Sequence, residues 1–229
     1  SMNLFEEVIE NACHSVHSTT NVEYQGTEIN FGRPWKRLRM TDAIAEKNGI
    51  DVLNMKKADI VQYMKDKNIA YDPKISHSKG LLISALFEET CEESLVQPTF
   101  ILDHPIDSTP LCKPLREYSM QQLEEMRKDP EQVIFVERFE PYINKWELGN
   151  SYTELNAPIL QRSLLEEQVE RGRGGEEETH PLDEDFLRAI EIGMPPTTGV
   201  GLGVDRLVML LTNSQSIRDV LLFPLMRPL

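Results

Sequence analysis

Hydrophobic and polar residues follow a helical period over much of this chain. The apolar positions of 3–16 recur every three or four residues, at Leu4, Val8, Ile9, Ala12 and Val16. This spacing predicts an amphipathic helix. Capping residues, terminal glycines and similar spacing predict further helices at 41–49 (capped by Thr41-Asp42), 57–67, 78–94, 119–128, 159–171, 183–193 (capped by Asp183) and from about Asp205. We expect the glycine-rich and acidic segment 172–178 to be a solvated loop.

Strands are predicted between these helices. Alternating polarity over 22–32 predicts a hairpin that turns at Gln25-Gly26, and the segment 98–105 predicts a strand that ends at a proline. The segments 131–143 and 145–155 predict two strands joined at Asn144-Lys145. Because helices interrupt antiparallel strands without a βαβ series, the predicted fold class is α+β.

Glycines alternate with apolar residues in TGVGLGVDR, 198–206. In an extended segment Gly199, Gly201 and Gly203 share one face, which is then bare enough for a flat ligand to lie on the backbone. We expect the intervening residues to point into the core: Val200, Leu202 and Val204. Arg206 follows where the strand becomes a helix. The alternative is close helix–strand packing that requires only small residues.

Two glutamates form a candidate metal site on the predicted hairpin. If Asn144-Lys145 is a two-residue turn, Glu140 and Glu147 are diagonal neighbours on one face, roughly 7–8 Å apart at the backbone. Two carboxylates this close repel unless a cation lies between them, and oxygen ligands suit Mg²⁺ that carries phosphates. The alternative is two solvated glutamates on an exposed face.

Asn150, Tyr152 and Glu154 follow at a spacing of two and share one strand face. A carboxamide, a phenol and a carboxylate could bind an amino-acid-like ligand that carries a cation, with the carboxylate supplying the charge. Strict alternation would put this trio on the face opposite Glu147. We therefore predict a β-bulge near Leu148-Gly149, which places both sets in one pocket. The alternative is the ordinary polar face of an edge strand.

Composition narrows the class of protein. The 229 residues have 40% hydrophobic content and a formal net charge of −14, which predicts a globular protein that binds nucleic acid poorly without basic surface from elsewhere. Three widely spaced cysteines favour reduced thiols in the cytoplasm. No apolar run predicts a membrane span or a secretory leader, and Ser1-Met2 is typical of an expression-tag remnant. His104 and Cys112 are interpreted as buried structural residues, and four other histidines as surface residues: His14, His17, His77 and His180.

Three blocks resemble the class II lysyl-tRNA synthetase family. They are PTFILDHP with STPLCK (98–113), ERFEPYINKWELGNSYTELNAP (137–158) and MPPTTGVGLGVDRLVMLLTNSQSIRDVLLFPLMRP (194–228). The last block matches the third signature motif of that family, and its ending FPLMRP is specific to the aspartyl, asparaginyl and lysyl subgroup. The resemblance is strong from Pro98 onward and weak across 40–95.

The resemblance implies an antiparallel sheet flanked by helices that binds ATP bent over Mg²⁺. It implies that Arg206 stacks on the adenine above Gly201 and Gly203, with Glu147 and Leu148 also contacting ATP. It implies that Glu140 and Glu147 hold Mg²⁺. Lysine would be selected by a last set of residues: Asn150, Tyr152, Glu154 and Gly201.

The implied reaction is lysine–tRNA ligation. The lysine carboxylate attacks the α-phosphate of ATP to give lysyl-adenylate and pyrophosphate, and the lysyl group then passes to the 3′ end of tRNA(Lys). The carboxylate is already a nucleophile, so positioning and charge neutralisation carry the rate. The resemblance also implies a cytoplasmic enzyme, a homodimer at full length.

The chain departs from the family pattern in what it lacks. The first and second signature motifs and the anticodon-binding β-barrel are not visible, so 3–229 resembles the C-terminal portion of the catalytic domain, with a helical insertion at about 40–95. A charged segment, 114–131, is also added, and insertions of this kind are usually surface loops. We expect this portion alone not to activate lysine at a useful rate. Two alternatives remain: a paralogue that lysylates a protein, and a non-catalytic binding module derived from a synthetase.

Overall fold

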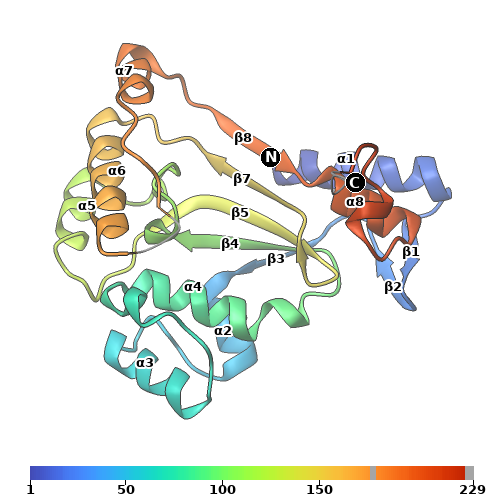
Figure 1. Cartoon of the computed structure of the whole chain (residues 1–229), viewed down its shortest axis with the longest axis horizontal. Helices are drawn as coiled ribbons and strands as arrows, with labels where there is room; N and C mark the ends of the chain where they lie inside the picture. Colours follow the sequence, from blue (N-terminus) through green and yellow to red (C-terminus); the bar gives the residue numbers. More distant parts are fainter. Residues whose placement is uncertain (176–178, 225–229) are drawn as a thin grey trace, which may run out of the picture.

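A six-stranded sheet forms the centre of the molecule, for which the computed structural model describes residues 1–175 and 179–224 (Figure 1). Five strands lie in the order β3 (Lys36–Arg39), β4 (Thr99–Pro105), β5 (Phe135–Ile143), β7 (Gly149–Thr153) and β8 (Thr198–Leu202), and β6 (Trp146–Glu147) pairs with β5. All pairs are antiparallel except β3 and β4, which are parallel. The predicted α+β class, an antiparallel sheet flanked by helices, is confirmed.

One face of the sheet is covered by elements from both ends of the chain. These are α1 (Met2–His17), the hairpin of β1 (Asn21–Tyr24) and β2 (Thr27–Asn30), and α8 (Val204–Thr212). Figure 1 shows them gathered at one end of the molecule. Their apolar side chains share a core with Phe100, Phe139 and Ile143 of the sheet. The amphipathic first helix and the hairpin that turns at Gln25-Gly26 are as predicted.

The other face packs against three helices from the middle of the sequence. They are α2 (Met40–Asn48), α3 (Lys57–Asp66) and α4 (Lys79–Thr90), seen below the sheet in Figure 1. They share a second core with Leu38, Ile101 and Tyr142 of the sheet. The region predicted as a helical insertion is thus packed on the sheet.

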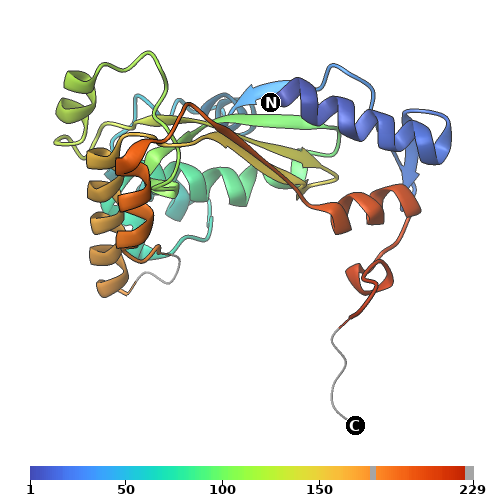
Figure 2. The same cartoon turned by 90° about the horizontal axis from the view of Figure 1, so that it is seen from above.

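A third apolar cluster lies at the far end of the sheet. There α5 (Met120–Met126) and α6 (Pro158–Arg173) pack around Cys112 and Val136, and α7 (Glu184–Gly193) lies beside α6 (Figure 2). The charged segment 114–131 belongs to this cluster. Its start pairs with β5, where the amide of Leu115 donates to the carbonyl of Phe135 over 3.0 Å. This segment is therefore anchored at its start and by the buried Leu123 of α5, while most of its residues are exposed, as expected for an insertion at the surface. The described residues also form four short 3₁₀ helices: η1 (Pro73–His77), η2 (Glu92–Ser94), η3 (Ile106–Ser108) and η4 (Ile217–Asp219).

Some predicted boundaries were wrong. The second helix begins at Met40 with Arg39 at its N-cap, so Asp42 lies in the first turn and does not cap it. The strand predicted over 131–143 begins only at Phe135, because 129–132 forms a turn closed by the amide of Gln132. α6 continues through Gly172 to Arg173, since one glycine costs a helix only about 1 kcal/mol. Residues 176–178 of the loop predicted over 172–178, and residues 225–228 of the ending FPLMRP, lie outside the described residues.

β3 and its parallel pairing were not predicted. Its sequence KRLR has one apolar residue, Leu38, which is buried in the core with α2–α4. Four residues with three charges show no alternation that separates a strand from a loop.

Asp183 caps α7 as predicted, because its side chain accepts from the amides of Asp185 and Phe186.

The central hairpin has the turn and the bulge that the sequence predicted. Asn144 and Lys145 have φ angles of 52° and 67°, as in the two-residue turns that match strand twist. Tyr142 pairs with Glu147 as expected, but further along Phe139 pairs with Ser151. Strict pairing from the turn would bring Phe139 to position 150. One extra residue therefore lies at Leu148-Gly149, which is the predicted bulge.

Gly149 has no room for a side chain. A Cβ there would overlap the carbonyl oxygen of Gly201 on β8 and lie 3.0 Å from the ring of Phe5 on α1. We expect Gly149→Ala to lower the free energy of unfolding by about 1–3 kcal/mol, because backbone and core must move apart. Urea denaturation measures this, with Gly201→Ala as the control, where a Cβ meets only main-chain atoms at 3.2 Å or more. Equal stabilities of the two variants would contradict the expectation.

Candidate functional site

The strand pairing brings the predicted site residues to one face of the sheet. Directly paired residues share a face, and so do alternate residues of one strand. The relevant pairs are Arg138 with Tyr152, Tyr142 with Glu147, Asn150 with Gly201, and Tyr152 with Gly199. Because the bulge reverses the alternation after Glu147, both glutamates, the predicted trio and the glycines fall on this face.

This face opens into a cavity of about 1050 Å³. Sheet residues Arg138, Glu140, Tyr142, Glu147 and His104 form one wall of the cavity. The opposite wall comes largely from α4 and the segment before it. The cavity therefore lies between the sheet and the helices of the middle region, beside the acidic pair.

The acidic pair is partly removed from water. Glu140 is only 7% exposed, and Glu147 is half-buried. Burial raises the pKa of Glu140 above its usual value, although the charge of Arg138 opposes the change. Burial raises the pKa of Glu147 too, and the negative charge of Glu140 adds to that increase. The negative charge of Glu140 thus adds to burial in disfavouring ionisation of Glu147, as expected for neighbouring carboxylates.

The donors present are compatible with Mg²⁺. The carboxylate of Glu147 accepts no hydrogen bond from the described residues, whereas Glu140 is held by Arg138 and by the hydroxyl of Tyr142 at 3.2 Å. No group of three or more His, Cys, Asp or Glu side chains able to hold a metal occurs in 1–175 and 179–224. Mg²⁺ usually takes one or two carboxylates and completes its shell with phosphates and water. Two carboxylates fit that pattern.

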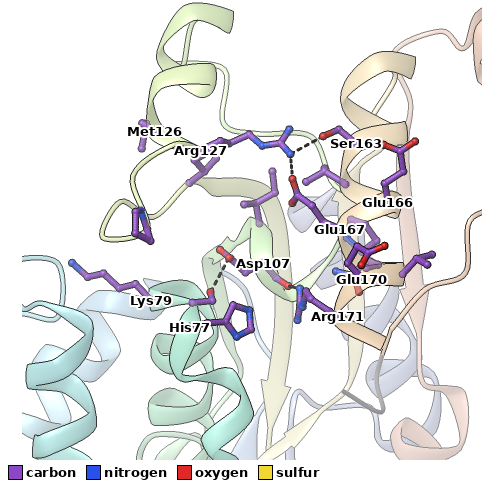
Figure 3. A pocket seen from close by; sticks show the side chains of 18 of the residues that line it. His77, Lys79, Asp107, Met126, Arg127, Ser163, Glu166, Glu167, Glu170 and Arg171 are labelled. Carbon is purple, nitrogen blue, oxygen red and sulfur yellow. Dashed lines mark hydrogen bonds and ion pairs between the residues drawn. The ribbon is translucent and has the colours of Figure 1, made fainter. Parts of the chain in front are cut away.

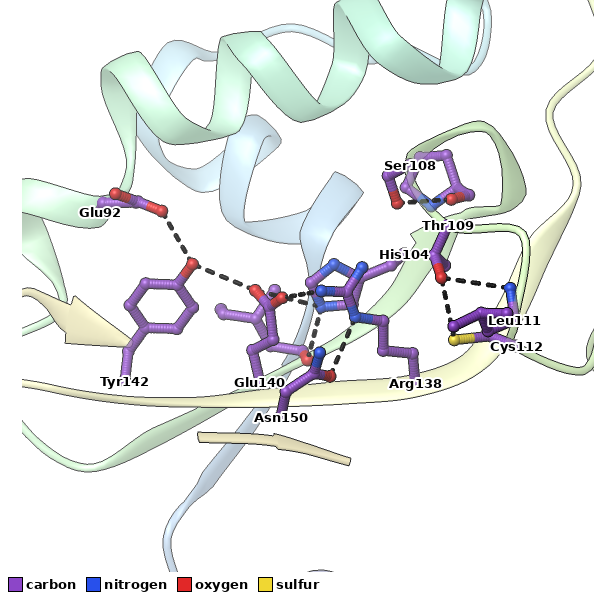
Figure 4. A network of polar contacts seen from close by, with 12 residues as sticks. Glu92, His104, Ser108, Thr109, Leu111, Cys112, Arg138, Glu140, Tyr142 and Asn150 are labelled. Carbon is purple, nitrogen blue, oxygen red and sulfur yellow. Dashed lines mark hydrogen bonds and ion pairs between the residues drawn. The ribbon is translucent and has the colours of Figure 1, made fainter. Parts of the chain in front are cut away.

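A polar network that the sequence analysis missed surrounds Glu140 (Figure 4). Arg138 contacts both Glu140 and Asn150, and the one hydroxyl hydrogen of Tyr142 is shared between Glu92 at 2.7 Å and Glu140 at 3.2 Å. The position of Arg138, two residues before Glu140 on the same strand face, was the available signal.

Glu154 occupies a half-buried position with no ion-pair partner among the described residues. Burial raises the pKa of its carboxyl above the usual value. Gly199 makes room for it, because a Cβ at Gly199 would lie 2.9 Å from Oε1 of Glu154. The space beside Gly199 is thus occupied by the side chain of Glu154, whereas we had expected it to be open to a ligand.

Gly201 and Gly203 keep the bare surface that was predicted. A Cβ on Gly201 would contact only the backbone of Asn150, and one on Gly203 would reach the backbone of Leu148 and Cβ of Arg206. No other side chain of the described residues occupies this space. A flat ligand can therefore lie against the main chain here.

Arg206 lies in the first turn of α8, and its side chain reaches back to the hairpin. The guanidinium donates to the main-chain carbonyl of Glu147. The side chain is otherwise exposed, so one side of the guanidinium plane remains accessible. Arg206 therefore lies at the edge of the bare glycine surface and next to the acidic pair.

The prediction that Val200 and Val204 point into the core was wrong. They are 45% and 60% exposed, and only Leu202 packs against the core shared with α1 and α8. β8 is the last strand of the described sheet, and Val204 is the first residue of α8. Neither position is covered by another described element.

His104 and Cys112 are buried structural residues, as predicted. Burial, reinforced by the charge of Arg138, lowers the pKa of His104 to about 3, so its imidazole is neutral near pH 7. Burial raises the pKa of the Cys112 thiol to about 11. The other histidines are exposed, again as predicted: His14, His17, His77 and His180.

A second cavity, of about 840 Å³, lies between α5, α6 and the start of α4 (Figure 3). Its charged side chains largely bond to one another or to the main chain. Arg127 contacts Glu167 and Ser163, and the hydroxyl of Ser78 donates to Asp107 over 2.7 Å. None of the predicted site residues lines this cavity. Of the predicted site residues, only Glu140 and Glu147 line the cavity of about 1050 Å³. The candidate site is therefore this cavity together with the adjoining sheet face, which carries the predicted trio and the glycines.

Comparisons with known proteins show the family of this chain. The family described as "tRNA synthetases class II (D, K and N)" matches residues 1–227. Proteins named lysine–tRNA ligase are similar along 99% of this chain: 42% identical in Clostridium perfringens (strain 13 / Type A), 42% in Thermoanaerobacter sp. (strain X514) and 43% in Streptococcus pyogenes serotype M3. The chain spans 42–43% of the length of these relatives. No described helix is both long and apolar enough to cross a bilayer.

Proposed function

Because this chain belongs to the class II tRNA synthetases of the D, K and N group, we propose that it carries the nucleotide and amino-acid site of a lysine–tRNA ligase. The observation that carries the proposal is the shared sheet face. An acidic pair, a bare glycine surface with an arginine at its edge, and an unpaired carboxylate all converge there. The substrates are ATP, L-lysine and tRNA(Lys).

ATP lies against the glycine surface in this proposal. Arg206 stacks its planar cation on the adenine while Gly201 and Gly203 form the floor. Leu148 contributes only main-chain contacts, because its side chain is buried in the core of the opposite face. Glu140 and Glu147 would hold Mg²⁺, which would supply positive charge beside the phosphates and offset the burial and the repulsion from Glu140 that raise the pKa of Glu147.

Lysine lies over β7. Glu154 receives the side-chain ammonium, Tyr152 packs along the aliphatic part, and Asn150 and Gly201 contact the main-chain end. Support comes from the energetic cost of Glu154, since a half-buried carboxylate without a partner destabilises the free protein. A bound ammonium would remove that cost. The lysine carboxylate then attacks the α-phosphate, and no protein base is needed because it is already ionised.

The remaining partners and the location follow from the same proposal. With a net charge of −14, this chain is a poor electrostatic partner for tRNA, so we place most of the tRNA-binding surface elsewhere. A homodimer at full length and a cytoplasmic location are part of the proposal. A non-catalytic module would have no reason to keep two neighbouring, partly buried carboxylates and the unpaired Glu154.

Pyrophosphate exchange tests the proposal. With the complete gene product, we expect exchange that depends on lysine, that stops when EDTA removes Mg²⁺, and that is accompanied by charging of tRNA(Lys). Ornithine, arginine and β-lysine serve as competing amino acids. We expect the 229-residue chain alone to be slower by about 10²–10⁵-fold, because the second signature motif, which in this family supplies an arginine for the α-phosphate, is not visible in its sequence.

Other outcomes identify the rivals. Lysylation of a protein with no charging of tRNA would favour the paralogue. ATP binding without exchange for any amino acid would favour a binding module. Exchange by the 229-residue chain at the speed of the complete protein would refute the expectation that this portion is incompetent alone.

A further inference from the structure

Arg138 lies between two groups that the proposed function assigns to different substrates. Its Nε donates to Oδ1 of Asn150 over 3.1 Å, and its Nη2 donates to the carboxylate of Glu140 (Figure 4). The side chain is 15% exposed, on the central strand β5 and in the wall of the cavity. One guanidinium thus contacts both a candidate magnesium ligand and a candidate lysine ligand.

The contact with Arg138 settles which way the Asn150 carboxamide points. A guanidinium only donates, so its partner on Asn150 must be the oxygen. The amide nitrogen then points away from Arg138, and it has no hydrogen-bond partner among the described residues. Asn150 is half-buried on the same sheet face as Glu140, so it presents a free N–H donor there while its oxygen is engaged by Arg138, which suits an anionic oxygen better than an ammonium.

We propose that Arg138 is a positioning residue that orients Asn150 to donate to the carboxylate of the amino acid and holds Glu140 beside it. This inference rests on the proposed function. It assigns the two ends of lysine to different positions of one strand face, the carboxylate to Asn150 and the ammonium to Glu154. It also links amino-acid recognition to the acidic pair through one planar cation.

A lysine side chain at position 138 cannot take over the role of Arg138. Binding Asn150 and Glu140 together uses two donors of a rigid fork, whereas an ammonium is a flexible point charge. In Arg138→Lys the charge remains, but the Asn150 carboxamide is free to turn its oxygen toward the bound amino acid. We expect Arg138→Lys to raise KM for lysine by about tenfold to a hundredfold, the range for a lost hydrogen bond to a charged group.

Lysinol distinguishes positioning from a general structural role, because it has the ammonium of lysine and no carboxylate. We expect Arg138→Lys to weaken binding of lysine to the complete gene product at least fivefold more than binding of lysinol. In an Asn150→Ala background the same substitution should no longer change the lysine-to-lysinol ratio, because Arg138 acts through Asn150. Calorimetric titration of both ligands, in each of the four proteins, measures this.

The matched control is Arg116→Lys. Arg116 also donates hydrogen bonds from two nitrogens to a glutamate of β5, Glu137. Its side chain, however, is 80% exposed and lies outside the cavity. We expect this variant to leave both ligands unaffected. Asn150→Asp provides a second test that leaves Arg138 in place. It keeps an oxygen for Arg138 and removes the donor, so lysine should bind more weakly while lysinol does not.

The outcomes separate this inference from the proposed function. If the unmodified protein binds lysine and lysinol equally and shows no lysine-dependent exchange, the proposed function fails. If it is active but Arg138→Lys changes lysine and lysinol by the same factor, the inference is overturned. Unchanged lysine binding by Asn150→Asp would overturn it even if Arg138→Lys did not fold.

Discussion

Replacing Arg206 with alanine is expected to lower kcat/KM for lysine-dependent pyrophosphate exchange by about 10²–10³-fold. The guanidinium is held at the edge of the glycine surface by the main-chain carbonyl of Glu147, so its position is set before the nucleotide arrives. Its loss removes both the stacking surface and a positive charge beside the phosphates. The measurement is exchange by the complete gene product at varied ATP concentration.

Arg218→Ala is the control for this substitution. Arg218 lies in η4, not far along the chain from α8, and is exposed without lining the cavity. We expect it to retain full activity. An Arg206→Ala protein with unchanged kcat/KM and unchanged ATP affinity would exclude the glycine surface as the nucleotide site. Arg206→Lys should recover charge but not stacking, and so only part of the rate.

The second large effect is expected for Glu154→Gln, which should raise KM for lysine by about a hundredfold. The variant keeps the shape of the side chain and removes the charge that pairs with the ammonium. Norleucine, which lacks that ammonium, provides the comparison. The preference for lysine over norleucine should fall by a similar factor, as measured by exchange with each amino acid.

Stability gives an independent readout of the same residue. Burial raises the pKa of Glu154 and no described partner offsets its charge, so Glu154→Gln should not destabilise the protein. The activities of the variant and of the unmodified protein can therefore be compared with both fully folded. Glu23→Gln, an exposed glutamate on β1, is the matched control and should change neither selectivity nor stability. If Glu154→Gln keeps the full preference for lysine, the ammonium is bound elsewhere.

Features that depend on neighbours in the sequence were predictable. Asn144-Lys145 adopts the left-handed turn that a two-residue hairpin needs, and Asp183 caps α7 through its own side chain. The bulge at Leu148-Gly149 followed from one requirement, that the glutamates and the trio share a face. Such features rest on backbone preferences and on the two-residue period of a strand, which short segments already contain.

Contacts between distant segments were not predictable. Tyr142 and Glu92 meet only because η2 follows a helix packed on the sheet, and Arg138 reaches Asn150 only because β5 pairs with β7 in the bulged register. The exposure of Val200 depends on the absence of a further described element over β8. Local patterns therefore predicted the class of fold and a set of candidate site residues that strand pairing brings to one face. Which donors meet which acceptors, and which apolar faces are covered, depended on packing between segments far apart in the chain, because those interactions have no local period in the sequence.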